Sequence, residues 1–143
     1  MTLAGVYAEV DALLAPFTCD GTSECCTFSN TGREPYPTAI ELAEVERAIA
    51  AKGGPRAFAK RKLPLVGRRC PLLTDAGKCG IYASRPFGCR TYFCDRMHGP
   101  GKLPRERLRE LGARIADLSA RAFPRDPGPR PLSKALSKTL ARH

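Results

Sequence analysis

The feature that most constrains this chain is its set of seven cysteines, all of which lie between positions 19 and 94. They form three groups, which are Cys19, Cys25 and Cys26, then Cys70 and Cys79, then Cys89 and Cys94. A disulfide framework requires an oxidising compartment, usually reached through a cleavable leader with a basic start. The stretch up to Glu9 has no basic residue, and an odd number of cysteines leaves one thiol unpaired. We therefore expect a cytoplasmic protein whose cysteines bind metal.

A soft metal such as zinc, or iron in a cluster, needs about four thiolates that converge on one point. No single cysteine group supplies four, so the groups must meet in the folded chain. Three arrangements remain open: a four-cysteine site with spare thiols, two zinc ions that share a bridging thiolate, or an iron–sulfur cluster with thiols beside it. The adjacent Cys25 and Cys26 point to opposite sides of an extended chain, which favours a centre more complex than one zinc ion held by four thiolates. All seven cysteines are therefore candidate ligands of zinc or of an iron–sulfur cluster, and the choice of metal stays open.

Three segments show the apolar spacing of amphipathic helices. The first covers residues 3–14, and the second starts at a capping box formed by Thr38 and Glu41. The third follows Pro104 and places four apolar residues on one face, namely Leu108, Leu111, Ile115 and Leu118. We expect these helices to cover the cysteine loops.

Two short arms flank the turn-prone residues 75–78, with Cys70 on one arm and Cys79 on the other. Such a pattern predicts a short β-hairpin, which would place these two thiols side by side. We therefore predict the α+β fold class: an α-rich, small and irregular domain in which helices pack around metal-binding cysteine loops with a short β-hairpin.

The chain of 143 residues has the size of one domain. We place the cysteine-cluster metal-binding domain at residues 1–122, with its core motif at 17–95. Residues 123–143 are expected to form a Pro-rich linker and a basic C-terminal tail.

Most of the net charge of +10 lies after the cysteines, because residues 96–143 contain twelve Lys or Arg and only four acidic residues. A basic C-terminal region of this kind attracts nucleic acid, anionic lipid or an acidic protein. The alternative is a solvated tail without a partner. No apolar run reaches the roughly 20 residues that span a bilayer, so we expect no membrane insertion and keep an acidic protein or nucleic acid as candidate partners.

Four short motifs carry a family resemblance. They are Cys70-Pro71-Leu72-Leu73, Cys79-Gly80-Ile81-Tyr82, Arg85-Pro86 and Cys89-Arg90-Thr91-Tyr92-Phe93-Cys94. Together with the earlier Cys-Cys loop they closely resemble the YkgJ-type cysteine-cluster family, also described as a zinc- or iron-chelating domain of the CxxCxxCC type, over residues 17–95. The resemblance implies a metal-chelating domain with no assigned reaction.

The sequence departs from the family pattern at Thr22, where the family usually has a further cysteine. The family's set of eight cysteines is thus seven here. Either a spare ligand is lost without consequence, or Thr22 stands at a ligand position and a water, Asp20 or Glu24 completes the coordination.

Two arginines, Arg85 and Arg90, bracket the turn that leads to Cys89. A guanidinium there would donate hydrogen bonds to ligand sulfur or offset the negative charge of a cluster, and so tune the metal. The alternative is an ordinary surface arginine. The chain has only two histidines, His98 and His143, and no phosphate-binding loop, so we predict no catalytic residue and expect that the protein is not an enzyme.

Three functions are compatible with these features. The first is a non-catalytic metal-binding module that folds around zinc or an iron–sulfur cluster. The second is an iron–sulfur redox or electron-transfer component, or a metallochaperone. The third is a nucleic-acid-binding protein in which zinc is the scaffold and the basic C-terminal region makes the contacts.

Overall fold

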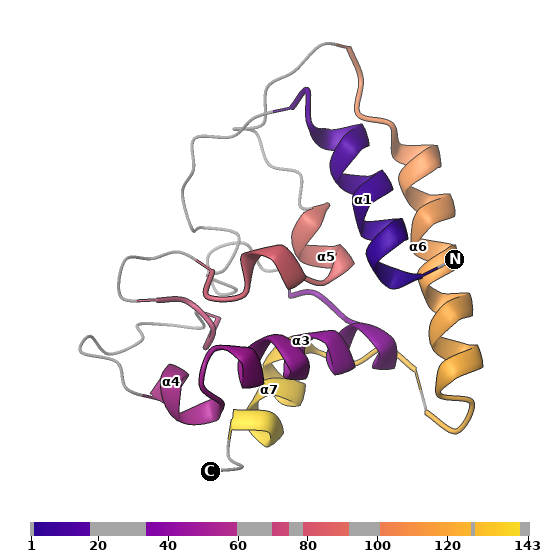
Figure 1. Ribbon diagram of the computed structural model, residues 1–143. Helices are drawn as coiled ribbons and strands as arrows, with labels where there is room; N and C mark the ends of the chain where they lie inside the picture. Colours follow the sequence, from indigo (N-terminus) through magenta and orange to yellow (C-terminus); the bar gives the residue numbers. More distant parts are fainter. Residues whose placement is uncertain are drawn as a thin grey trace.

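The computed structural model describes residues 2–17, 34–59, 70–74, 79–91, 101–126 and 128–140. Its helices are α1 (Leu3–Leu14), α3 (Ala39–Ala51), α4 (Pro55–Ala59), the 3₁₀ turn η2 (Tyr82–Ser84), α5 (Phe87–Arg90), α6 (Arg105–Ala122) and α7 (Leu132–Leu140). Helices α1 and α6 pack side by side, α3 also contacts α6, and the short α5 lies against α1 (Figure 1). The described residues thus form two helical layers, which meet where α3 contacts α6 and at the short α5.

The three helices expected from apolar spacing are all present. Helix α1 begins where Thr2 Oγ1 accepts a hydrogen bond from the Gly5 N–H over 3.1 Å. Helix α3 begins at the expected capping box, in which the Thr38 N–H donates to Glu41 Oε1 over 3.2 Å. Helix α6 buries three of its four expected apolar residues, so its helical prediction is also confirmed.

Two hydrophobic clusters hold these helices together. The α1/α6 cluster consists of Val6, Tyr7, Val10, Leu108, Leu111 and Ile115. The α3/α7 cluster consists of Leu42, Val45, Ala48, Ile49, Cys70, Leu72, Leu73, Ile81, Leu132, Ala135 and Leu136. Each buried aliphatic side chain of this size stabilises the fold by about 1.5–3 kcal/mol relative to exposure.

The C-terminal helix α7 is part of the core. Leu132 and Leu136 are 1% exposed and belong to the α3/α7 cluster. The start of the helix is tied to the chain before α3, because the Leu132 N–H donates to the Pro35 carbonyl over 3.0 Å and the Ser133 N–H to Glu34 Oε1 over 2.7 Å. Leu132 and Leu136, which lie four residues apart among basic residues, therefore form the face of α7 that packs inside the protein.

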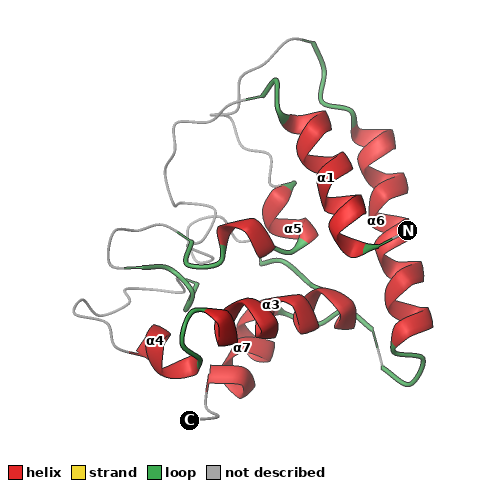
Figure 2. Ribbon diagram, in the orientation of Figure 1, coloured by secondary structure: helices red, strands yellow, loops and turns green. Residues whose placement is uncertain are grey.

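The predicted β-hairpin, and with it the α+β class, is wrong for the described residues, which are helical and contain no β-strand (Figure 2). The two arms meet only in one isolated antiparallel bridge between Leu73 and Cys79. One arm turns immediately, since the Leu73 N–H donates to the Cys70 carbonyl over 3.1 Å. The other arm enters η2, where the Ser84 N–H donates to the Ile81 carbonyl over 2.8 Å. Both arms are thus too short for a ladder, and a proline at position 71 removes one of the few donors.

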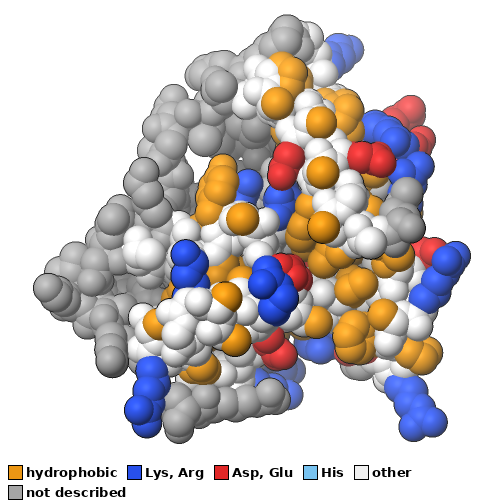
Figure 3. All heavy atoms as spheres, viewed as in Figure 1, with side chains coloured by type: hydrophobic (Ala, Val, Ile, Leu, Met, Phe, Trp, Pro, Cys, Tyr) orange, Lys and Arg blue, Asp and Glu red, His pale blue; other side chains and the backbone are white. Residues whose placement is uncertain are grey.

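The surface of the described residues carries charges of both signs. In the view of Figure 3, Lys and Arg side chains lie scattered over the molecule and do not gather in one patch. No helix in the described ranges has the length and apolar character needed to cross a membrane.

We predict that Leu136→Ala lowers the free energy of unfolding by about 2–5 kcal/mol, because it leaves a cavity in the α3/α7 cluster. Urea unfolding followed by circular dichroism measures the change. Lys134→Ala, an exposed position on the same helix, is the control and is expected to have little effect. Equal stabilities for the two variants would contradict the placement of α7 in the core.

Candidate metal centre

Three of the seven predicted ligands lie in the described residues, namely Cys70, Cys79 and Cys89. Cys70 is a buried member of the α3/α7 cluster, and Cys79 and Cys89 pack against the same cluster. Two described stretches, 70–74 and 79–91, therefore bring three cysteines into contact with one core cluster. The other predicted ligands, Cys19, Cys25, Cys26 and Cys94, lie outside the described residues.

Within the described ranges, no three Cys, His, Asp or Glu side chains form a group that would hold a metal ion. The ligand set therefore stays a prediction. Other predicted candidates also lie outside the described part of the chain. They are Thr22, where the family has a further cysteine, its neighbours Asp20 and Glu24, and both histidines.

The position of Cys79 depends on close backbone packing at Gly80. The Gly80 N–H donates to the Leu72 carbonyl over 2.9 Å. A Cβ at this position would lie 2.7 Å from Phe58 Cε1 and 3.0 Å from the Leu72 oxygen, so a larger residue would push the turn away from α4. The glycine after Cys79 thus allows this turn to lie against the core.

Cys89 lies on α5, a single turn that joins the two core clusters. Phe87 packs against the α1/α6 cluster, whereas Cys89 packs against the α3/α7 cluster. Between them, Gly88 lies so close to Pro35 that an added Cβ would be 2.7 Å from the proline Cβ. The orientation of Cys89 is therefore linked to the packing of both helical layers.

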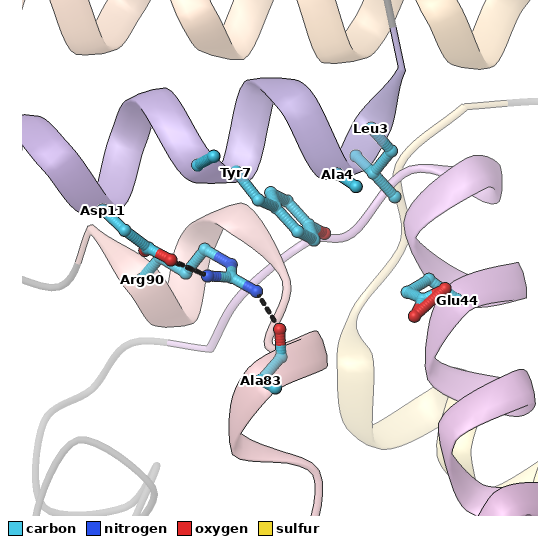
Figure 4. Close-up of a pocket in the computed structure, with 8 residues that line it drawn as sticks. Leu3, Ala4, Tyr7, Asp11, Glu44, Ala83 and Arg90 are labelled. Carbon is cyan, nitrogen blue, oxygen red and sulfur yellow. Dashed lines mark hydrogen bonds and ion pairs between the residues drawn. The ribbon is translucent and has the colours of Figure 1, made fainter.

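Arg90, the next residue, is buried against α1, and its side chain is 2% exposed. Its guanidinium donates to Asp11 over 2.8 Å (Figure 4). It also donates to the Arg85 carbonyl over 2.7 Å and stacks on the Tyr7 ring at 3.9 Å. It is thus an anchor of α5 and no ordinary surface arginine.

Arg85 has a different environment, because its guanidinium stacks on the exposed Tyr82 ring at 3.8 Å. The described contacts of Arg85 and Arg90 are with oxygens and aromatic rings. Hydrogen bonds from either residue to ligand sulfur stay a prediction.

Glu41 is a functional candidate that the sequence identified only as a helix cap. Its Oε1 accepts from the Thr38 N–H and hydroxyl, while its Oε2 accepts from the Tyr7 hydroxyl over 2.9 Å and from the Phe87 N–H. The residue is 3% exposed. The partners at Tyr7 and Phe87 are 34 and 46 residues away in the chain, and no local sequence signal points to contacts of that range.

A small pocket of about 240 Å³ lies between α1, α3 and η2 (Figure 4). Its lining residues are Leu3, Ala4, Tyr7, Ala8, Asp11, Glu44, Ala83 and Arg90. Glu44 accepts from the Ser84 hydroxyl over 3.0 Å, and the Arg47 guanidinium beside it holds the pKa of its carboxyl below the usual range. The acidic groups of the pocket are thus both engaged, Asp11 by Arg90 and Glu44 by Ser84 and Arg47.

The fold and the cysteines together define a small helical domain with a cysteine cluster. Residues 18–106 match the CxxCxxCC family, described as “Putative zinc- or iron-chelating domain”. The chain belongs to this family, which confirms the resemblance carried by the cysteine motifs. Comparisons with curated proteins and with solved structures give no match.

The donor set fits the metals named by this family. Thiolates are soft ligands that suit zinc and iron–sulfur centres, whereas calcium and magnesium prefer oxygen. Cys70 is buried and the other two described cysteines are half-buried, so a centre beside them would be partly shielded from water. A metal-binding role is therefore supported by both the family and the residues.

We predict that Tyr7 weakens the fold at alkaline pH. Burial raises the pKa of its hydroxyl above the ordinary value, and the adjacent Glu41 carboxylate raises this pKa further. The unfolded chain releases this proton near pH 10 while the folded chain keeps it, so the free energy of unfolding falls as the pH rises above about 10. Urea unfolding at a series of pH values from about 9 to about 11.5, on either side of the ordinary tyrosine pKa, measures this loss.

Tyr7→Phe should show a smaller alkaline loss of stability than the unsubstituted protein, since it has no hydroxyl to titrate. Its stability at neutral pH should be lower by about 1 kcal/mol, because Glu41 loses one hydrogen bond. Tyr82→Phe is the control, because the Tyr82 side chain is exposed. An alkaline loss of the same size in the Tyr7 variant as in the control would contradict the prediction.

Proposed function

We propose that this protein binds zinc or iron through its cysteines and acts as a non-catalytic metal-binding module. The observation that carries the proposal is that Cys70, Cys79 and Cys89, from the two stretches 70–74 and 79–91, all lie in or against one core cluster. Membership of a zinc- or iron-chelating family supports it. The seven cysteines are the residues that would hold the metal.

A metal bound at these cysteines would act first on folding. The segments around Cys70 and Cys79, 70–74 and 79–81, form only one isolated bridge between them. Stretches with so little regular structure gain most from a ligand that cross-links them. When bound, zinc would supply a structural cross-link, and an iron–sulfur cluster would in addition supply one-electron chemistry.

The test of this function is the metal content of protein purified without oxygen. Elemental analysis, acid-labile sulfide and an absorption spectrum are measured on one untreated sample. Zinc without visible colour supports a structural module, whereas iron with sulfide and a brown absorption band supports the redox alternative. Protein with neither metal, and with no uptake of zinc or iron when these are added under reducing conditions, would overturn the proposal.

Replacement of single ligands should lower the metal content. We predict that Cys89→Ser and Cys94→Ser each bind metal about 10-fold or more weakly, because a serine hydroxyl is a far poorer ligand for a soft metal than a thiolate. Competition with a chromophoric chelator measures the affinity. Ser137→Ala, at an exposed position of α7, is purified in parallel as the control. Metal affinity and stability unchanged in both cysteine variants would contradict the ligand assignment.

The nucleic-acid alternative has less support among the described residues. Several arginines of the basic C-terminal region have acidic partners. The described ion pairs join Arg107 to Glu9 and Glu110, Arg114 to Glu9, Arg121 to Asp117, and Arg130 to Asp126. The visible face likewise has no single basic patch (Figure 3). A continuous basic face is the usual electrostatic feature of a nucleic-acid-binding protein, so we prefer the metal-binding module.

A further inference from the structure

We propose that the buried Glu41 carboxylate is a positioning residue for Cys89. It holds the start of α5 in place, and α5 presents the Cys89 thiolate to the metal. This inference rests on the proposed function, because it requires Cys89 to be a metal ligand.

Helix α5 needs an external support at its start. It has four residues, Phe87–Arg90, and so consists of about one turn. A helix this short is not stable alone, since one turn fixes many backbone angles for very few hydrogen bonds. The Phe87 N–H, two positions before Cys89, has no helical partner and donates instead to Glu41 Oε2.

Glu41 is well suited to support α5, because it is itself fixed from two other directions. Its Oε1 is held at the start of α3 by the Thr38 N–H at 3.2 Å and hydroxyl at 3.1 Å. Its Oε2 also accepts the Tyr7 hydroxyl of α1 at 2.9 Å. A displacement of this carboxylate would break contacts to three helices, so the start of α5 has little freedom.

The end of α5 has a second support on α1. Arg90, which follows Cys89 directly, forms an ion pair with Asp11 at 2.8 Å and stacks on the Tyr7 ring. The Cys89 side chain is therefore placed between two supports, one two residues before it and one on the next residue. Both supports are independent of the metal, so the thiolate can be in position before the metal binds.

The geometry requires a carboxylate and not an amide. Two of the four donors to Glu41 are the backbone N–H groups of Thr38 and Phe87, which cannot turn round to become acceptors. A carboxylate offers one oxygen to each of them. Glutamine has a single oxygen, so its NH₂ group would face one of the two N–H groups and repel it. Glu41→Gln should therefore weaken the support of α5, either directly at the Phe87 N–H or through displacement of residue 41 at the start of α3, with almost no change in volume.

The experiment compares the full chain with Glu41→Gln and Glu46→Gln. Glu46 is on the same helix but exposed, and the oxygen of glutamine can keep its hydrogen bond from the Thr139 hydroxyl. The probe is cobalt(II), added to metal-free reduced protein, because thiolate-to-cobalt absorption reports both binding and geometry. Release of cobalt to excess EDTA gives a rate, and circular dichroism gives the folded fraction of each metal-free protein.

We expect Glu41→Gln to release cobalt about 10- to 100-fold faster than the unsubstituted protein, with a shifted absorption spectrum, and Glu46→Gln to match the unsubstituted protein. A general loss of stability would lower the folded fraction but leave the spectrum of the bound metal unchanged. An unchanged spectrum and release rate in folded Glu41→Gln, with normal cobalt binding by the unsubstituted protein, would overturn the positioning role and leave the proposed function standing. Failure of the unsubstituted protein to bind cobalt, zinc or iron would overturn both.

Asp11→Asn decides the matter if Glu41→Gln does not fold. Asp11 is 53% exposed, so its replacement weakens the second support of α5 without burial of an unsatisfied group at that position. Faster cobalt release with a shifted spectrum would support the inference that the contacts holding α5 determine the position of Cys89. Release and spectrum identical to those of the unsubstituted protein would show that the metal geometry at Cys89 does not follow the supports of α5, and would therefore overturn the inference, which has Glu41 act through α5.

Discussion

The arrangement of the helices depends on one buried carboxylate. Glu41 accepts four hydrogen bonds from donors on α1, the start of α3 and the start of α5. A buried acidic group is costly unless its oxygens are satisfied, and these four donors satisfy both of them. Because the donors lie far apart in the chain, the carboxylate is fully satisfied only in the complete fold. Its burial therefore favours this one arrangement over other ways of packing the same amphipathic helices.

Helix α5 links this helix packing to the position of Cys89, a predicted metal ligand. Phe87 reaches the α1/α6 cluster, Cys89 the α3/α7 cluster, and Arg90 the acidic Asp11 of α1. One turn of helix thus connects both hydrophobic layers and a predicted metal ligand. Such a connection couples metal binding to helix packing, since a shift of the thiolate requires a shift of groups that are buried on two sides.

The part of the chain beyond the family match also contributes to the core beside the cysteines. The match ends at residue 106, but α7 supplies Leu132, Ala135 and Leu136 to the cluster that contains Cys70. Helix α7 therefore contributes to the hydrophobic core, although the segment is basic in composition. Its leucines help to exclude water from the cluster that contains Cys70, and its Lys side chains remain exposed.

The sequence by itself determined the amphipathic helices, the capping box of α3 and the family, because periodicity, capping and cysteine spacing can be recognised directly in the sequence. It suggested a hairpin where the structure has one isolated bridge, since turn-prone residues do not reveal whether the flanking arms continue as strands. Only the tertiary structure decided that Glu41 joins three helices, that Arg90 pairs with Asp11, and that α7 is buried. The long-range hydrogen bonds of Glu41 and Arg90 join residues 34 to 79 positions apart, and the burial of α7 joins apolar faces of different helices. Such partners are chosen by the packing of the whole chain, and no local pattern encodes them.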